Sequence, residues 1–136
     1  QVGIYDKVYI LGDFSWSNAQ KTMEILKQLN GIKILIIGNH DCNYLNKKGF
    51  DKSLFKSVHS YMELRINKKL VVMSHYPIID WNGKYHGSYL FYGHVHTIDN
   101  EDTQYMTNLR KKGYNCYNVG IDVHKKLVKL EDFVNE

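Results

Sequence analysis

The sequence has little of what marks several classes of protein. It contains only two cysteines, Cys42 and Cys116, which form neither a disulfide framework nor a cysteine pair of the kind that binds zinc. No apolar run approaches the ~20 residues that a membrane-spanning helix needs, and no signal-peptide pattern is visible. Repeats, low-complexity segments and linkers are also lacking. We therefore expect a protein of the reducing cytoplasm with no membrane partner.

What the sequence contains suits one compact domain with a substantial core. Of its 136 residues 43% are hydrophobic, and 18 lysines and arginines against 14 aspartates and glutamates give a formal net charge of +4. The positive excess is small and scattered, which predicts solvated surface lysines. Such a charge favours the approach of a phosphate-bearing substrate, whereas nucleic-acid binding stays open without support from the sequence.

The most informative stretch is residues 34–41, Ile-Leu-Ile-Ile-Gly-Asn-His-Asp. Its four branched apolar residues predict a strand buried on both faces, and Gly38 allows a sharp turn. Asn39, His40 and Asp41 follow at once, at the carboxyl end of the strand, where open α/β sheets bind ligands. Taken alone, the stretch also fits an ordinary strand that is followed by a polar turn.

A comparable strand comes earlier in the chain. Residues 7–11 form a short β-branched and aromatic run that leads to Asp13. A helix with one apolar stripe should follow over about 19–30, with Ser17 as its expected N-cap. Strand, helix and strand of these lengths make a βαβ unit, which places Asp13 and Asn39 at the same edge of a parallel sheet.

Later predicted strands end in histidines. The further elements expected are strands over 58–66, 70–73, 89–92, 115–119 and, weakly, 125–132, a hairpin turn at 67–68, and helices over 51–56 and 101–110. His75 follows one of these strands, and His94 and His96 follow another. On an extended backbone a spacing of two puts both imidazoles on one side, while Val95 packs away. Imidazole, carboxylate and amide oxygen together suit Mn²⁺, Fe, Co²⁺ or Zn²⁺ rather than Ca²⁺.

These motifs resemble those of the calcineurin-like metallophosphoesterases. That family carries, in order, Asp-x-His, Gly-Asp, Gly-Asn-His-Asp/Glu, a lone His and Gly-His-x-His; the chain has the last four, at 12–13, 38–41, 75 and 93–96. It is most similar to small bacterial and phage members, with His-Tyr-Pro at 75–77 and Trp-Asn-Gly at 81–83. The resemblance implies a four-layer α/β/β/α sandwich with two mixed sheets, in a single domain over 1–136.

The resemblance also implies a set of metal ligands. Asp13 would bridge two metals, and Asn39, His75 and His94 would complete the shell of one of them. His96 would belong to the other metal. The expected cofactors are therefore divalent transition metals, two in the complete protein, among Mn, Fe, Zn, Ni and Co.

The catalytic residues that the family implies are His40 and Asp41. His40 would lie beside the phosphoryl group as an acid or charge stabiliser, oriented by Asp41. The implied reaction is the hydrolysis of a phosphate mono- or diester by in-line attack of a metal-bound hydroxide. The expected substrate is a small molecule or a nucleotide.

One block of the family has no counterpart, because residues 1–12 contain no Asp-x-His. Two ligands of the second metal would then be lacking, and we expect that truncation has removed the first strand and helix of the family; the other possibility is a degenerate member. The remaining sheet would expose an apolar edge, which a second copy of the chain could cover. The alternative function is a catalytically weak or inactive metal- or phosphate-binding remnant, and a nucleic-acid-binding module is a further rival.

Residues between the last two motifs allow two interpretations. The aromatic and basic side chains of Tyr76, Trp81, Lys84 and Tyr85 could line a substrate pocket or pack within their own loop. The sequence does not decide between these roles. The histidines outside the motifs, which we expect at the surface or in packing, are His59, His86 and His124.

Overall fold

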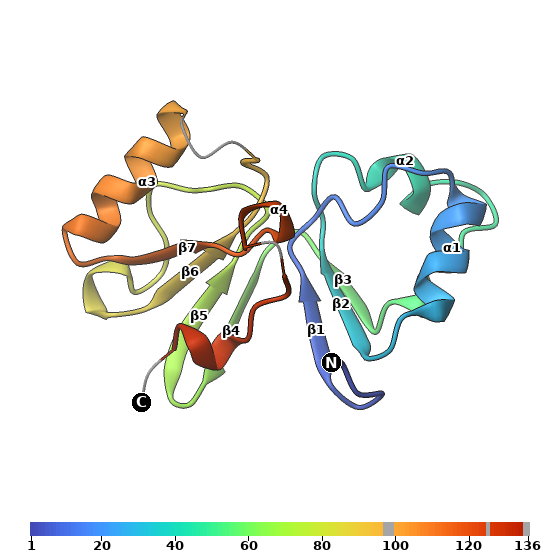
Figure 1. Ribbon diagram of the computed structural model, residues 1–136, viewed down its shortest axis with the longest axis horizontal. Coiled ribbons are helices and arrows are strands. Elements are labelled where there is room, and N and C mark those ends of the chain that lie inside the picture. Colours follow the sequence, from blue (N-terminus) through green and yellow to red (C-terminus); the bar gives the residue numbers. More distant parts are fainter. Residues whose placement is uncertain (97–99, 125, 135–136) are drawn as a thin grey trace. The chain divides into compact units, whose positions relative to one another are not determined.

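The computed structural model describes residues 1–96, 100–124 and 126–134, which fall into two compact units. Unit 1 spans Gln1–Ser60 and unit 2 spans Tyr61–Glu136. Each unit contains one sheet with helices (Figure 1). The described strands of unit 1 form a parallel sheet, and those of unit 2 form a mixed one. The predicted α/β class with two sheets is confirmed, whereas the single domain over 1–136 stays a prediction.

Unit 1 begins with the predicted βαβ arrangement. Its elements are β1 (Lys7–Ile10), α1 (Ala19–Gln28), β2 (Ile32–Ile36), α2 (Cys42–Leu45), the 3₁₀ turn η1 (Lys52–Leu54) and β3 (Ser57–His59). The strand order is β1-β2-β3, and Ile10 lies opposite Leu35 in parallel register. The N-cap of α1 is Asn18, one residue later than predicted, because its side chain accepts a hydrogen bond from the backbone of Lys21.

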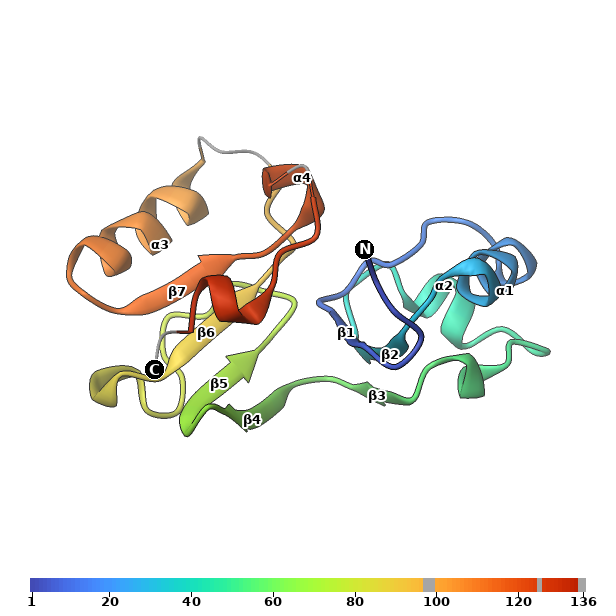
Figure 2. The ribbon, with the colours of Figure 1, turned by 60° about the horizontal axis from the view of Figure 1, so that its bottom comes forward.

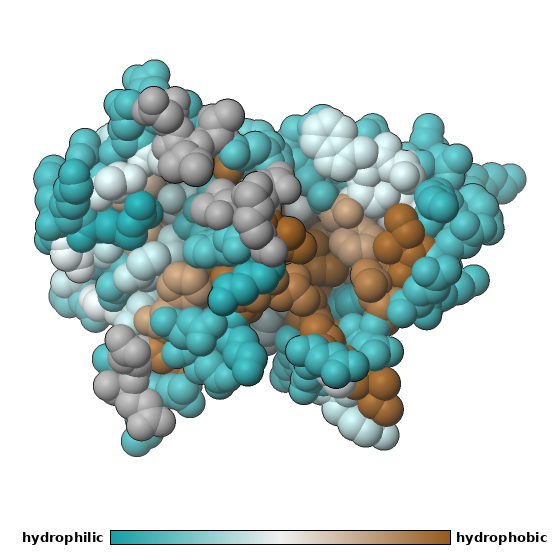
Figure 3. All heavy atoms as spheres, in the orientation of Figure 1, coloured by the Kyte–Doolittle hydropathy of each residue, from teal (hydrophilic) through white to brown (hydrophobic). Residues whose placement is uncertain are grey.

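One face of the unit 1 sheet carries the helices and the core between them. The buried residues of this core are Leu26, Leu35, Tyr44, Leu45 and Phe55. β1 is at one edge of the sheet, and its residues Val8, Tyr9 and Ile10 are only half-buried. Figure 3 shows hydrophobic residues exposed among the hydrophilic surface of unit 1. What covers that edge stays a prediction.

Unit 2 is built around a four-stranded sheet of order β4-β5-β6-β7. Its elements are β4 (Met62–Ile66), β5 (Lys69–Met73), the 3₁₀ turn η2 (Lys84–His86), β6 (Tyr89–Tyr92), α3 (Glu101–Lys111), β7 (Asn115–Asn118), α4 (Ile121–His124) and the 3₁₀ turn η3 (Leu130–Asp132). β4 and β5 are antiparallel, and the other pairs are parallel. The predicted hairpin turn is confirmed, since Asn67 and Lys68 have φ angles of 51° and 67°, as a type I′ turn requires.

The two faces of the unit 2 sheet are covered differently. α3 packs beside β7 (Figure 2), over a core made of Val72, Trp81, Leu90, Tyr92, Met106, Leu109 and Cys116. On the opposite face the rings of Tyr89, Phe91 and Tyr117, at alternate positions of β6 and β7, contact one another. Phe133, which follows η3, packs against Phe91 and Tyr117. None of the helices in the described part of the chain has the length and apolarity that crossing a membrane requires.

Two predicted strands differ in the structure. The strand expected over 58–66 is divided at Ser60, since β3 pairs with β2 in unit 1 and β4 pairs with β5 in unit 2. Alternation of polar and apolar residues continues through the break, so the pattern cannot show where one sheet ends. The weak strand expected over 125–132 is wrong for its described residues, which form a loop and η3; Lys125 lies outside them.

Candidate functional site

In unit 1 two loops meet at the carboxyl ends of β1 and β2. The two strands are parallel neighbours, so the segments that follow them leave the same edge of the sheet. Oδ1 of Asp13 accepts a hydrogen bond from the backbone N–H of His40 at 2.7 Å. The structure therefore confirms that Asp13 and residues 39–41 lie at one edge.

The carboxylate of Asp41 ties these two loops together. Asp41 is fully buried. Oδ2 accepts the backbone N–H groups of Gly38 and Asp13, each at 2.7 Å, and Oδ1 accepts that of Phe14 at 3.0 Å. The hydroxyl of Tyr44 also donates to Oδ1, at 2.5 Å. None of these four partners is the imidazole of His40, which Asp41 was predicted to orient.

Burial of this network changes the acidity of the tyrosine in it. The pKa of Tyr44 is raised far above the ordinary value near 10, first because the phenol is buried and next because it donates to Asp41. The phenol therefore stays a hydrogen-bond donor over the whole physiological range. It supplies the fourth partner of a carboxylate that has no solvent contact.

The imidazole of His40 stacks on an exposed tryptophan. The ring centroids of His40 and Trp16 are 3.7 Å apart, and the two planes are inclined by 27°. Trp16 was not among the residues that the motifs single out. The sequence did contain a signal, because the aromatic Trp16 follows closely after the strand-end Asp13. It does not show which side chain the indole contacts.

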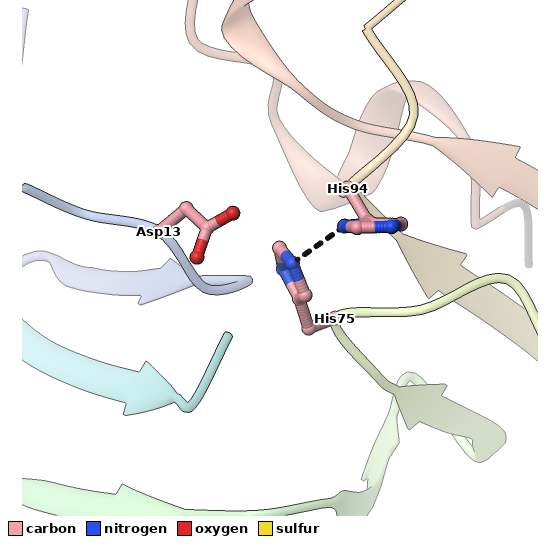
Figure 4. A group of neighbouring side chains, drawn as sticks. All are labelled: Asp13, His75 and His94. Carbon is pink, nitrogen blue, oxygen red and sulfur yellow. Dashed lines mark hydrogen bonds between the residues drawn. The ribbon is translucent and has the colours of Figure 1, made fainter. Parts of the chain in front are cut away.

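In unit 2 the parallel register of β5 and β6 brings His75 and His94 together. Met73 lies opposite Phe91, and the backbone N–H of Gly93 donates to the carbonyl of His75 at 3.0 Å. Nε2 of His75 and Nδ1 of His94 are 3.2 Å apart, joined by the dashed line in Figure 4. His75 is buried. Two ring nitrogens that face each other at this distance share a hydrogen bond here and could also serve as ligands of one metal ion.

Aromatic contacts hold this pair of histidines. The rings of His75 and His94 meet edge to face, and the ring of Tyr76 contacts both, with centroid distances of 4.9 and 4.7 Å. Tyr76 is 44% exposed, so part of its ring remains accessible to a ligand of this unit. The third labelled residue of Figure 4, Asp13, belongs to the loop after β1.

The backbone at His94 differs from the prediction. Its φ angle is +66°, and the N–H of Val95 donates to the carbonyl of Gly93 at 2.7 Å in a tight turn. The extended backbone on which His94 and His96 would share one side is therefore not present. Val95 packs inward as predicted, whereas His96 is exposed and does not join His75 and His94 in one ligand cluster of the described residues in unit 2.

Asp13 has the same left-handed conformation as His94, with a φ angle of +51°. Residues other than glycine adopt this conformation at a cost of about 1–3 kcal/mol, and they cluster in tight turns and at active sites. Apart from these two, the described residues other than glycine with positive φ are Asn67 and Lys68 of the hairpin turn. The two strained positions therefore fall on strand-end motifs, one in each unit.

The loop after His75 packs largely against itself. Trp81 is buried in the core, and the buried Nζ of Lys84 donates to the carbonyl of Ile79 at 2.7 Å. The same Nζ lies 5.0–5.3 Å from the ring centroids of Trp81, Tyr85 and Tyr114. For Trp81 and Lys84 packing is the better interpretation, while Tyr85 is exposed.

Comparison with known proteins agrees with this arrangement of motifs. The sequence matches the family described as Calcineurin-like phosphoesterase over residues 3–130. No curated protein matches it. A crystal structure from Aquifex aeolicus, described as the protein of unknown function AQ665, is similar with a TM-score of 0.63 and 27% sequence identity. The similarity covers 88% of this chain and 69% of that one.

Proposed function

We propose, from the premise that this chain belongs to the calcineurin-like phosphoesterase family, that it hydrolyses a phosphate ester with bound divalent transition metals. The family is metal-dependent and acts on phosphate esters, so the coarse activity follows from membership. The observation that carries the proposal for this chain is the pair of facing ring nitrogens on His75 and His94. Such a pair suits a metal of the Mn, Fe, Co or Zn type.

The proposed ligands fit these metals by their chemistry. One metal would be held by the carboxylate of Asp13, the amide oxygen of Asn39 and the imidazoles of His75 and His94; the other would be held by Asp13 and His96. A mixture of nitrogen and oxygen donors without thiolate disfavours both Ca²⁺ and a closed structural zinc site. When bound, such metals acidify water and neutralise charge on the phosphate oxygens.

The residues of unit 1 have separate tasks in this proposal. The backbone N–H of His40 fixes the direction of the Asp13 carboxylate, through the hydrogen bond at 2.7 Å. The imidazole of His40 would donate a proton to the leaving alkoxide or stabilise its charge. Asp41 would hold the loops that carry Asp13 and His40, and its predicted orientation of the His40 ring stays a prediction.

Metal affinity tests the ligand assignment directly. Calorimetry with Mn²⁺ should show binding to the wild-type chain, weakened at least about tenfold in His75→Ala and His94→Ala, since loss of one donor costs about 1.4 kcal/mol or more. His86→Ala is the matched control, because His86 is exposed on η2 and outside the motifs. Equal affinity in wild type and the two ligand variants would exclude this pair as a metal site.

A second candidate function is a metal- or phosphate-binding protein with little or no turnover. The observation that favours it is the same pair of facing ring nitrogens on His75 and His94, because binding a metal there does not by itself require turnover. Hydrolysis of bis(p-nitrophenyl) phosphate and p-nitrophenyl phosphate by the Mn²⁺-loaded chain separates the two. Turnover supports the enzyme, and tight metal binding without turnover supports the remnant.

Several finer assignments are part of the proposal and rest on the sequence. They are a nucleotide or small-molecule substrate, the choice between mono- and diester, a cytoplasmic location and the pairing of copies through the edge at β1.

A further inference from the structure

We infer that Trp16 is a positioning residue that sets the orientation of the His40 imidazole; this inference rests on the proposed function. The stacked indole is 65% exposed, so burial of its own surface does not account for its place. One face of the indole is taken by His40 at a centroid distance of 3.7 Å. An exposed aromatic ring against the candidate acid of the reaction points to a role in that reaction.

The backbone next to Trp16 is anchored. Before it, the N–H of Phe14 donates to the buried carboxylate of Asp41, and the hydroxyl of the buried Ser15 accepts a hydrogen bond of 2.8 Å from the fully buried Thr22 of α1. After it, the N–H of Ser17 donates to the same Ser15 hydroxyl at 3.1 Å. The backbone that carries the indole is therefore held in place by hydrogen bonds, so the indole stacks on His40 from a fixed position of the loop.

The imidazole of His40 is oriented by little else in its unit. Its backbone is fixed by the bond to Asp13, but among the described residues of unit 1 its ring takes part in the stack with Trp16 and in no hydrogen bond. The neighbouring carboxylate of Asp41 is occupied by three backbone N–H groups and a tyrosine hydroxyl. A general acid has to present its N–H in one direction, and here the indole face selects that direction.

The size of the expected effect follows from the strength of aromatic pairs. The free energy of such a pair changes the population of the stacked ring orientation by about 2- to 12-fold. Trp16→Ala should therefore lower kcat by about 2- to 12-fold for an ester with an alkoxide leaving group, with KM unchanged. A p-nitrophenyl ester should lose little, because nitrophenolate leaves without a proton. Trp16→Phe retains an aromatic face and should recover most of the loss.

Two measurements on the full chain test this inference, the first with Mn²⁺ and the second without added metal. Steady-state kinetics compares Trp16→Ala and Trp16→Phe with wild type on an alkyl and a p-nitrophenyl ester. Tyr5→Ala is the matched control, because Tyr5 is an exposed aromatic residue of the same unit. Proton NMR without added metal follows the ring C–H signals of His40, assigned by their absence in His40→Gln. The indole should shift them upfield, and Trp16→Ala should remove that shift.

The outcomes are distinct. Loss of the upfield shift together with a kcat loss confined to the alkyl ester supports the inference. His40 signals that do not change in Trp16→Ala, equal losses on both esters, or an effect on KM alone would overturn it, the last by making Trp16 a substrate-binding surface. A wild-type chain without turnover would overturn the proposed function and the catalytic part of this inference with it. A defect in His40→Ala without one in Trp16→Ala would overturn this inference alone.

Discussion

The two units hold their candidate functional side chains by different means. In unit 1 a buried carboxylate, Asp41, gathers hydrogen-bond donors from both strand-end loops and so fixes Asp13. In unit 2 the register of two parallel strands places His75 and His94 side by side, and ring packing holds them. The comparison teaches that a polar network holds the loop of the strand-end carboxylate in this chain, whereas strand pairing and packing place the imidazoles.

The largest expected effects come from removing one histidine from each unit, which tests whether the histidines of the two units have different roles. His40→Ala in unit 1 should lower turnover of an alkyl ester by about 10²- to 10⁴-fold, because the leaving group loses its acid. Its metal content should stay that of wild type. His94→Ala in unit 2 should instead lose metal and turnover together. Metal per chain by elemental analysis, measured beside kcat, distinguishes the two.

Loss of metal in His40→Ala would make His40 a ligand and would contradict its assignment. The p-nitrophenyl ester is the internal control, because it should be affected much less by His40→Ala. His86→Ala controls for removal of an imidazole as such.

A smaller effect is expected on stability, and it should be larger in unit 1 than in unit 2. Asp41→Asn turns one oxygen of a buried acceptor into a donor that faces other donors, which should lower the free energy of unfolding by about 3 kcal/mol or more. Lys84→Met in unit 2 removes a buried hydrogen bond and cation–π contacts, at a cost of about 1–3 kcal/mol. Urea unfolding measures both.

Each unit contains one tryptophan, which allows the two changes to be followed separately. Trp16 reports on unit 1 and Trp81 on unit 2, so fluorescence can be recorded in backgrounds that retain only one of them. Glu24→Gln and Lys69→Met, both at exposed positions, are the matched controls and should change stability by less than about 0.5 kcal/mol. An Asp41→Asn midpoint equal to that of Glu24→Gln would contradict the role of the Asp41 network.

The smallest predicted effect is a difference in alkaline sensitivity. The folded-state pKa of Tyr44 is raised by burial and by Asp41, so its contribution to stability is complete below about pH 10 and is lost as the pH rises above that value. Unit 1 should lose about 1.4 kcal/mol per pH unit there, and Tyr44→Phe should remove this slope. Urea unfolding at stepwise higher pH measures it.

Tyr61 of unit 2 is the matched comparison. Its pKa is raised to about 12 by partial burial and by its hydrogen bond to Glu63, so its contribution should fade between about pH 10 and 12. Because Tyr61 is 43% exposed, Tyr61→Phe should change the slope less than Tyr44→Phe does. Equal slopes of stability against pH for the two variants would show that the Asp41–Tyr44 network in unit 1 is no better shielded from solvent than the Tyr61–Glu63 contact in unit 2.

Much of the candidate site could be predicted because its signals are local. Runs such as 34–37 and 70–73 predict buried strands, and the residues that follow each run lie at the edge of the sheet where the strand ends. The parallel pairing of β1 with β2 and of β5 with β6 bears this out. The conformation of His94 was not predictable in this way, because a spacing of two indicates one side only where the backbone is extended.

The sequence by itself determined the α/β class, the family and the order of the strand-end motifs, since each of these depends on short runs of residues and their spacing. Only the tertiary structure decided that Asp41 binds the backbone of Asp13 and Phe14, 28 and 27 residues away, and that Trp16 covers His40. The physical reason is that a carboxylate can accept hydrogen bonds from any donor, and an indole can stack on any ring, that folding brings near. Which partner each side chain contacts depends on the conformation of the loops after the strands have paired.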